Sequence, residues 1–341
     1  MSSPVDTRKR GLRDLRISVT DRCNFRCVYC MPKSVFGASY KFLERKELLT
    51  FEEIERVARA FVANGVVKLR LTGGEPLVRR QVEELIARLS QISGVEDLSL
   101  TTNAALLSEK RAHALREAGL HRVTVSLDSL NDATFMLVND VNFPVAKVLA
   151  GIDNAAAAGL GPVKINMVVK RGMNDSEVIA MARHFRGTPH ILRFIEYMDV
   201  GTTNGWHLDQ VMSSQEIAAA IDAELPIEAI DPNYNGEVAK RWRYRDGGGE
   251  VGIISSVSQP FCGSCTRARL SAEGQIYTCL FASSGHDFRT MVRDGASESE
   301  LAEAVGKIWR VRDDRYSEIR TFETERLHEL GPKIEMSYIG G

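Results

Sequence analysis

The sequence predicts an α/β fold, a partial (β/α)6 barrel of the TIM type followed by an α+β extension. Strand patterns alternate with helix patterns from residue 12 to residue 198, and such alternation implies parallel strands joined by right-handed crossovers. A doubly wound open sheet is the alternative to a barrel. Unusual polar residues follow nearly every strand, which favours a barrel, whose sites lie at the carboxyl ends of the strands. Beyond residue 200 the alternation stops, which indicates a different second region.

The six strands are expected where apolar residues alternate or cluster with β-formers, at residues 12–20, 66–72, 97–102, 121–128, 163–169 and 190–198. Helices are expected between them at residues 50–64, 79–92, 108–118, 144–158 and 175–186. Thr50 and Glu53 form a capping box at the start of the first helix, and Gly65 follows its end.

The second region begins after a loop and a short helix that Ser213 and Glu216 cap. The turn-rich segment 231–236 marks a boundary, so we expect a barrel core over residues 1–230 and an extension over 231–341. A hairpin is predicted from 238–245 and 250–256, and a helix over 297–310. The last residues, 336–341, are apolar, and we expect a flexible end there.

The composition excludes several classes of protein. The chain has 341 residues, with 44 basic and 45 acidic side chains and a net charge of −1, which argues against binding nucleic acid through overall positive charge. No apolar run approaches the roughly 18 residues that a membrane span needs, and the N-terminus lacks the apolar core of a secretory signal. We therefore expect a cytoplasmic protein without a nucleic acid or membrane partner.

The sharpest motif is the triplet Cys23, Cys27 and Cys30, within eight residues after the first strand. Three thiolates on one loop suit a [4Fe–4S] cluster, which normally takes four, and leave one iron open to a small molecule. A structural zinc site would need a fourth ligand such as Asp21. A disulfide with one free thiol is a further alternative, disfavoured in a reducing compartment.

A second triplet, Cys262, Cys265 and Cys279, repeats this arrangement near the end of the chain. Zinc would have to borrow His286 as a fourth ligand. A second iron–sulfur cluster with one open iron fits the pattern better, because three cysteines again supply one ligand fewer than such a cluster normally takes. An open iron so far from the first triplet in sequence is a place to bind substrate.

Two further features accompany the cysteines. Gly73-Gly74-Glu75-Pro76 follows the second strand, where glycines let the backbone approach a ligand closely.

Positive side chains occur inside predicted barrel strands, which is unusual for a parallel sheet buried on both faces. Arg267 and Arg269 also lie one residue apart in an extended segment. The strand cations are Arg16, Arg70, Lys164 and Arg193. In a nearly neutral protein, this set predicts a polyanion site inside the barrel.

The first triplet and the GGEP turn resemble those of the radical SAM superfamily. The whole chain from Arg13 to Gly341 resembles the GTP 3′,8-cyclase family, which performs the first step of molybdenum cofactor biosynthesis. The stretches that match in order are LRISVTDRCNFRCVYCMPK, TGGEPLVRR, RFIEYMDVG, SVSQPFCGSCTRARL and the terminal YIGG. The sequence departs at Ala104, where the family often has glycine after Thr-Thr-Asn.

The resemblance implies two [4Fe–4S] clusters, one on each cysteine triplet, together with S-adenosylmethionine (SAM) on the first. It implies that Gly340 and Gly341 reach into the pocket and, with Arg16, assist catalysis. The residues that it implies for SAM are Tyr29, Gly74, Glu75, Ser126 and Met198. The residues that it implies for GTP are Arg16, Arg70, Thr101, Lys164, Arg193, Arg267 and Arg269, with the guanine on the open iron of the second cluster.

The implied reaction is a lyase-type cyclisation. A deoxyadenosyl radical removes the 3′ hydrogen of GTP, and the C3′ radical then adds to C8 of guanine. The resulting aminyl radical is reduced by one electron and protonated to give (8S)-3′,8-cyclo-7,8-dihydroguanosine 5′-triphosphate. The family implies cyclic pyranopterin monophosphate synthase as the next enzyme, an electron donor such as flavodoxin or ferredoxin, and a monomer or homodimer. A radical SAM peptide-modifying enzyme with an auxiliary cluster, and a non-enzymatic iron–sulfur carrier, are the alternatives.

Overall fold

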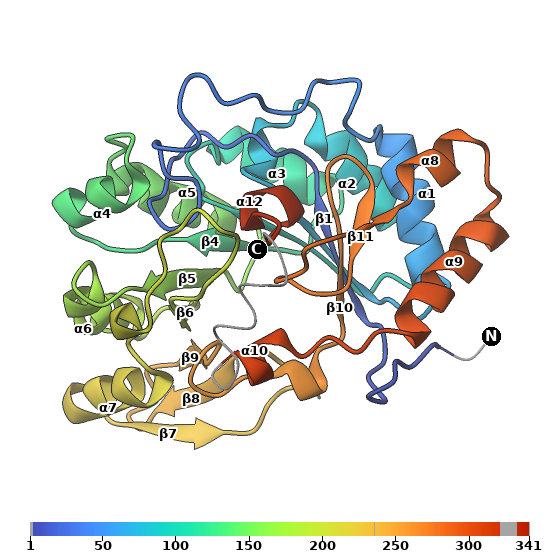
Figure 1. Ribbon diagram of the computed structural model, residues 1–341. Coiled ribbons are helices and arrows are strands. Elements are labelled where there is room, and N and C mark those ends of the chain that lie inside the picture. The colour runs from blue at the N-terminus through green and yellow to red at the C-terminus, as the bar shows by residue number, and fades with distance from the viewer. Residues whose placement is uncertain (1–2, 235, 321–332, 341) are drawn as a thin grey trace.

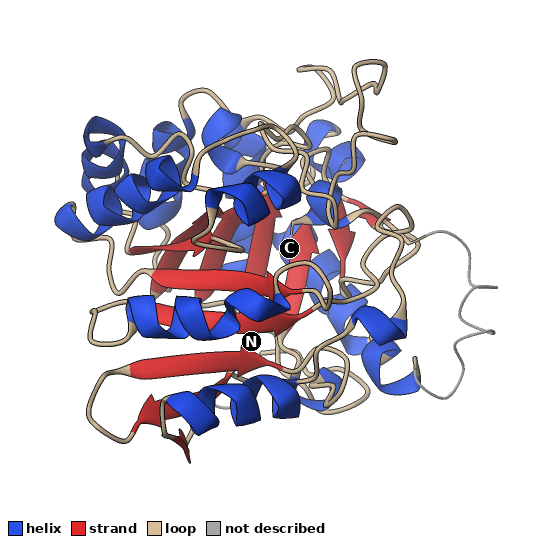
Figure 2. Cartoon of the chain, turned by 90° about the vertical axis from the view of Figure 1, so that its left-hand side faces the viewer, coloured by secondary structure: helices blue, strands red, loops and turns tan. Residues whose placement is uncertain are grey.

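The computed structural model describes residues 3–234, 236–320 and 333–340. In this part of the chain twelve strands form one curved sheet, flanked by helices (Figures 1 and 2). Along the sheet the strands follow the order β12-β11-β10-β1-β2-β3-β4-β5-β6-β9-β8-β7. The barrel strands are β1 (Asp14–Ser18), β2 (Lys68–Thr72), β3 (Asp97–Thr102), β4 (Arg122–Ser126), β5 (Lys164–Val169) and β6 (Ile191–Glu196).

These six strands confirm the predicted barrel. Each lies within its predicted range, and neighbouring strands pair in parallel in the order of the sequence. The helices that follow them are α1 (Phe51–Val62), α2 (Val82–Ser90), α3 (Glu109–Glu117), α4 (Asp132–Asn139), α5 (Val145–Ala157) and α6 (Val178–Phe185). Thr50 and Glu53 do form the capping box of α1. The predicted helix over 79–92 is shorter, because Gln81 takes a left-handed conformation before α2.

Three further strands flank the six barrel strands at each end of the sheet. They are β7 (Ile227–Ile230), β8 (Lys240–Tyr244), β9 (Glu250–Ile254), β10 (Arg267–Leu270), β11 (Gln275–Tyr277) and β12 (His286–Asp287). The predicted hairpin is β8 and β9. The sequence did not predict that β9 pairs in parallel with β6, or that β10 pairs in parallel with β1. One sheet therefore crosses the boundary expected at residue 230.

The helices that follow the barrel strands are α7 (Ser214–Glu224), α8 (Arg289–Arg293), α9 (Glu298–Arg310), α10 (Tyr316–Ile319) and α12 (Met336–Ile339). Ser213 and Glu216 cap α7 as predicted. Helix α9 packs against α1 on the outside of the barrel. The extension is thus joined to the barrel both by strand pairing and by helix packing.

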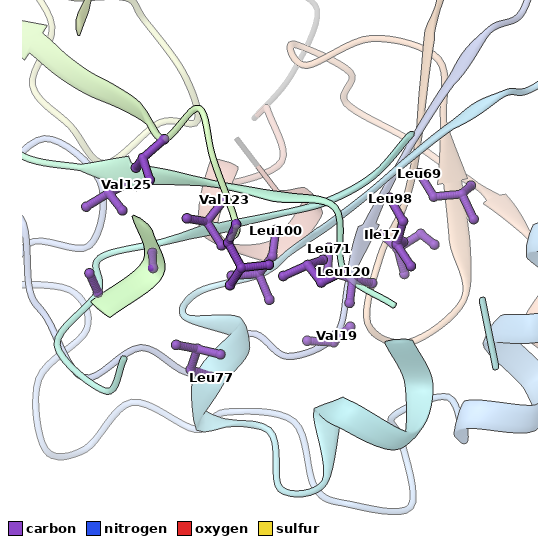
Figure 3. Packing of buried hydrophobic residues seen from close by; sticks show 14 of the residues in the cluster. Ile17, Val19, Leu69, Leu71, Leu77, Leu98, Leu100, Leu120, Val123 and Val125 are labelled. Carbon is purple, nitrogen blue, oxygen red and sulfur yellow. The ribbon is translucent and has the colours of Figure 1, made fainter. Parts of the chain in front are cut away.

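The hydrophobic core lies between the outer face of the strands and the helices. Figure 3 shows part of it, with Leu69, Leu71, Leu98 and Leu100 from adjacent strands packed together. Successive side chains of a strand point to opposite faces, so the residues between these leucines face the interior of the barrel. Polar and charged residues therefore line the interior, which is where the site lies.

The end of the chain differs from the flexible tail that we expected. Residues 336–339 form a helical turn whose Ile339 is fully buried, and α12 contacts β1 near the centre of the molecule (Figure 1). Two side chains just before it fix its position. Lys333 donates to the Asp199 carboxylate over 2.8 Å, and Glu335 accepts from the Thr202 backbone N–H over 2.9 Å.

Over the described residues, no helix is both long and apolar enough to cross a membrane.

Candidate active site inside the barrel

A cavity of about 320 Å³ occupies the interior of the barrel. Both cysteine triplets line it, and so do all the predicted SAM and GTP residues. Those residues are Arg16, Tyr29, Arg70, Gly74, Glu75, Thr101, Ser126, Lys164, Arg193, Met198, Arg267 and Arg269. The structure therefore brings together in one pocket residues that the sequence separates by more than half of its length.

The first triplet lies on a tight loop after β1. The Cys27 carbonyl accepts from the backbone N–H of Cys30 over 2.9 Å and from that of Met31 over 2.8 Å, which turns the loop back on itself. The Arg26 guanidinium donates to the carbonyls of Cys23 and Phe36, both over 2.8 Å. These contacts satisfy the backbone of a loop that leaves its thiols free for other ligands.

The GGEP turn packs directly on this loop. The Gly74 N–H donates to Thr20 over 2.8 Å, and the Glu75 N–H donates to Arg22 over 2.9 Å. A Cβ on Gly74 would lie 2.3 Å from the Arg22 carbonyl oxygen, and Gly73 has a φ of +145°. Side chains at either position would push the two loops apart, so the glycines set the distance between the GGEP turn and the cysteines.

The buried carboxylate of Glu75 is held by the protein itself. It accepts from the backbone N–H groups of Leu77 over 3.0 Å and Asn103 over 2.7 Å, and from Thr102 Oγ1 over 2.7 Å. Burial raises its pKa to about 7, although these hydrogen bonds counteract the shift. These hydrogen bonds join the GGEP turn to the end of β3, and Glu75 also lines the cavity.

Tyr29 is held by Asp128, an acidic residue just beyond the end of β4. Its hydroxyl donates to Asp128 over 2.7 Å, and the other oxygen of Asp128 accepts from the Val168 N–H over 2.9 Å. Burial raises the pKa of Asp128 to about 6, and the two hydrogen bonds counteract it. The residue lies directly beyond β4, and this position after a strand was the signal for it.

The second triplet has a more positive environment. Arg267 donates to the Cys265 sulfur over 3.3 Å, and Arg312 donates to the Cys265 carbonyl over 2.9 Å. Burial opposes ionisation of Cys265, but the charges of Arg267 and Arg312 outweigh it and lower its pKa to about 6. Arg10 donates to the Cys262 carbonyl over 2.7 Å. Arg10 and Arg312 were not among the predicted residues, since each is distant from the triplet in sequence.

The positive side chains of the strands form rows across the inner face. Arg269, Arg16 and Arg70 occupy paired positions on β10, β1 and β2. Burial and mutual repulsion lower the pKa of Arg269 and of Arg193 to about 9 and that of Lys164 to about 7. Such crowding of like charges is costly without a bound anion. It therefore supports the polyanion site.

The tail reaches the same pocket. The Gly340 carbonyl accepts a hydrogen bond from Arg269. A Cβ on Gly340 would lie 1.9 Å from Thr72 Oγ1, and the φ of Gly340 is +77°. Glycine is thus required at this contact with the end of β2. Gly341 lies outside the described residues.

The donor sets suit clusters better than single ions. Among the described residues, no three His, Cys, Asp or Glu side chains converge closely enough to share one metal ion. Neither Asp21 nor His286, the fourth ligands considered for zinc, is among the described residues that line the cavity. In a cubane cluster each thiolate binds a different iron, so the thiols need to surround the cluster rather than meet at one point.

Family models match both regions. A model of the radical SAM superfamily matches residues 17–185, and a model described as Molybdenum Cofactor Synthesis C matches residues 190–318. Similar curated proteins named GTP 3′,8-cyclase come from Acidothermus cellulolyticus, at 52% identity over all of both chains, and Xanthomonas axonopodis pv. citri, at 51% over all of both chains. A third, from Staphylococcus aureus, is 48% identical over 97% of each chain.

Solved structures show the same fold. The crystal structure of Streptococcus suis SuiB bound to S-adenosylmethionine matches 92% of this chain and 68% of that chain, with a TM-score of 0.60 and 14% sequence identity. This likeness confirms the radical SAM barrel as the architecture.

Proposed function

The chain belongs to the GTP 3′,8-cyclase family of radical SAM enzymes, and we propose that its barrel pocket performs the family's reaction with the residues described above. The enzyme is a lyase that converts GTP to (8S)-3′,8-cyclo-7,8-dihydroguanosine 5′-triphosphate in the first step of molybdenum cofactor biosynthesis. The family implies a [4Fe–4S] cluster and SAM. The observation that carries the proposal is one cavity lined by two cysteine triplets and a set of buried cations.

The first triplet would hold the cluster to which SAM binds. Cys23, Cys27 and Cys30 are free thiols beside the GGEP turn, where Gly74 keeps the backbone close to the cysteine loop. The contacts to SAM would come from Tyr29, Gly74, Ser126 and Met198, with Glu75 acting through the turn that it holds. When bound, the cluster and SAM supply a 5′-deoxyadenosyl radical that removes the 3′ hydrogen of GTP.

The second triplet would hold a second [4Fe–4S] cluster with an open iron for the guanine. Arg267 touches the Cys265 sulfur and lines the same cavity. Arg16, Arg70, Thr101, Lys164, Arg193 and Arg269 would bind the remainder of GTP. Guanidinium groups bind phosphate oxygens through two parallel hydrogen bonds, so this set suits a triphosphate.

The residues of the chain orient the substrate and exclude water. Holding C3′ of the ribose close to C8 of the guanine converts the cyclisation into a reaction between fixed neighbours, which removes much of the entropic barrier. We propose that Gly340 and Gly341 complete the pocket and assist catalysis with Arg16. The contact between Gly340 and Arg269 supports this role, because it joins the tail to the row of arginines.

The remaining assignments rest on the family and the sequence. We propose that the product passes to cyclic pyranopterin monophosphate synthase, and that flavodoxin or ferredoxin supplies electrons to a monomer or homodimer. We propose a cytoplasmic location, where reducing conditions keep the six thiols available. We also retain as a proposal the division into a core over 1–230 and an extension over 231–341.

Deuterated substrate tests the proposal. Reconstituted protein is incubated anaerobically with SAM, a reductant and GTP deuterated at C3′. We expect the cyclised nucleotide, together with deuterium in the 5′-deoxyadenosine. Deuterium that stays in unchanged GTP while SAM is cleaved would contradict the proposal and would favour the alternative of a peptide substrate.

A further inference from the structure

The row of arginines continues beyond the residues assigned to GTP. From β10 to β2 the paired positions carry Arg269, Arg16 and Arg70. The next position is Ser99 on β3, and the position after it is Arg122 on β4. Partners in a parallel sheet point to the same face, and Arg122 lines the cavity with the others. Arg122 was not among the predicted residues, because it is the first residue of its strand and only the register of the sheet places it in the row.

Arg122 belongs to the same field of positive charge. Its charge is one cause, besides burial, of the lowered pKa values of Arg70, Lys164 and Arg193. Unlike those three residues, Arg122 is held by an acid. Its Nε donates to Asp97 over 3.0 Å, and its Nη2 donates to the other oxygen of the same carboxylate. The ion pair fixes the plane of the guanidinium group.

The ion pair with Asp97 uses two of the three guanidinium nitrogens of Arg122. Arg122 Nη1 is buried and has no hydrogen-bond partner among the described residues. A buried donor without an acceptor is costly, and more so when it is charged. Arg122 lines the cavity, and Asp97 sets the orientation of its guanidinium group, so Nη1 is a buried donor beside the cavity that has no acceptor among the described residues.

Arg241 shows what such an arginine does when no ligand is needed. It pairs with Glu250 through Nε and Nη2, as Arg122 pairs with Asp97. The two side chains have the same exposed fraction, 18%. The remaining nitrogen of Arg241, however, donates to the Asp231 carbonyl over 2.7 Å. Of these two matched arginines, only the one in the cavity keeps a donor without a protein partner.

The position in the row indicates which part of the substrate it meets. Adjacent strands lie roughly 4.8 Å apart, so the path from Arg269 to Arg122 spans about 19 Å along the sheet and less across the curved interior. Arg269 lies beside the second triplet, where the guanine is proposed to bind. A nucleotide that starts there and extends along the row brings its last phosphate toward β4.

We propose that Arg122, oriented by Asp97, binds the terminal phosphate of GTP and makes the pocket selective for a triphosphate over a diphosphate. Asp97 is the positioning residue, and Nη1 is the donor that reaches the substrate. The inference rests on the proposed assignment of GTP to this pocket.

Equilibrium binding of GTP and GDP tests the proposal. Reconstituted protein is used anaerobically without SAM, so that no turnover occurs. Arg122→Met should weaken GTP binding about tenfold to hundredfold, the range for a lost charged hydrogen bond, and should leave GDP binding close to that of the unsubstituted protein. Arg241→Met is the matched control and should change neither affinity. Arg122→Gln, which keeps one donor for Asp97, serves if the methionine variant does not fold.

Asp97→Asn adds a test of positioning. It should weaken GTP binding less than Arg122→Met does, since the cation stays, and it should again spare GDP. Equal losses of GTP and GDP affinity in the Arg122 variants would overturn the inference and make Arg122 structural. Failure of the unsubstituted protein to bind GTP would overturn the proposed substrate site itself, which is a different result.

Discussion

The two ends of the cavity differ in charge although they share one wall. At the end with the first triplet, the buried charged groups nearest the thiols are acidic, and Glu75 raises the pKa of Cys23 while Asp128 raises that of Cys27, both in addition to burial. At the other end, Arg267 and Arg312 lower the pKa of Cys265. Cys279 of the second triplet does not share this effect, because burial and the charge of Asp314 raise its pKa to about 12. The two cysteine motifs thus differ in their electrostatic surroundings chiefly at Cys265.

The difference matches the two ligands. SAM carries a sulfonium, an ammonium and a carboxylate group, and its net positive charge is favoured by acidic surroundings, whereas the triphosphate of GTP is favoured by arginines. A net charge of −1 therefore conceals a strongly divided pocket. The lesson is that overall charge excludes little about a site whose charges are buried and separated.

Removing one cysteine from each triplet should have the largest effect. Cys30→Ser should abolish both SAM cleavage and cyclisation. Cys279→Ser should abolish cyclisation and spare SAM cleavage, because it removes only the second cluster. Iron content should fall in each variant from about eight to about four per chain. Equal loss of both activities in the two variants would contradict the division between the ends.

Gly340→Ala should disrupt the contact between the C-terminal tail and Thr72 at the end of β2. The new Cβ would collide with Thr72, so cyclisation should fall at least tenfold while the fold stays intact. Gly295→Ala is the control, since Gly295 also has a positive φ of +86° but has open space around it. It should cost about 1 kcal/mol of unfolding free energy and no activity. Activity assays and urea denaturation measure the two effects, and a fully active Gly340→Ala would show that the tail contact is dispensable.

Substitutions at opposite ends should affect opposite ligands. Arg70→Met should raise the KM for GTP about tenfold to hundredfold and leave the KM for SAM unchanged. Tyr29→Phe removes the hydrogen bond to Asp128 and should raise the KM for SAM only. Arg88→Met, which breaks an exposed ion pair with Glu52 on the outside of the barrel, is the control. The comparison fails if either pocket variant changes both KM values equally.

The smallest expected effect concerns pH. Burial and the charges of Arg193, Arg122 and Arg70 lower the pKa of Lys164 to about 7. The free enzyme therefore carries this positive charge below that pH and loses it above, so kcat/KM for GTP should decline as pH rises past about 7. Lys164→Arg should stay charged and move the decline upward. An unchanged profile in that variant would show that Lys164 does not contact the phosphates.

The sequence was sufficient for the barrel, and its motifs singled out the cysteines and the GGEP turn, which the structure places around one cavity. All six barrel strands were predicted because each has a local pattern, and the cysteines and GGEP stand out by spacing. The parallel pairing of β10 with β1 and of β9 with β6 was not predicted, because it joins segments that are distant along the chain. Arg122 and Asn103 gain their roles only through register and hydrogen bonds, which no local pattern records.

Counting iron together with SAM cleavage decides whether one pocket holds a cluster for SAM and a cluster for GTP. Reconstituted protein is assayed anaerobically for 5′-deoxyadenosine with and without GTP. We expect about eight irons per chain and more 5′-deoxyadenosine when GTP is present. About four irons, or SAM cleavage that ignores GTP, would contradict this expectation.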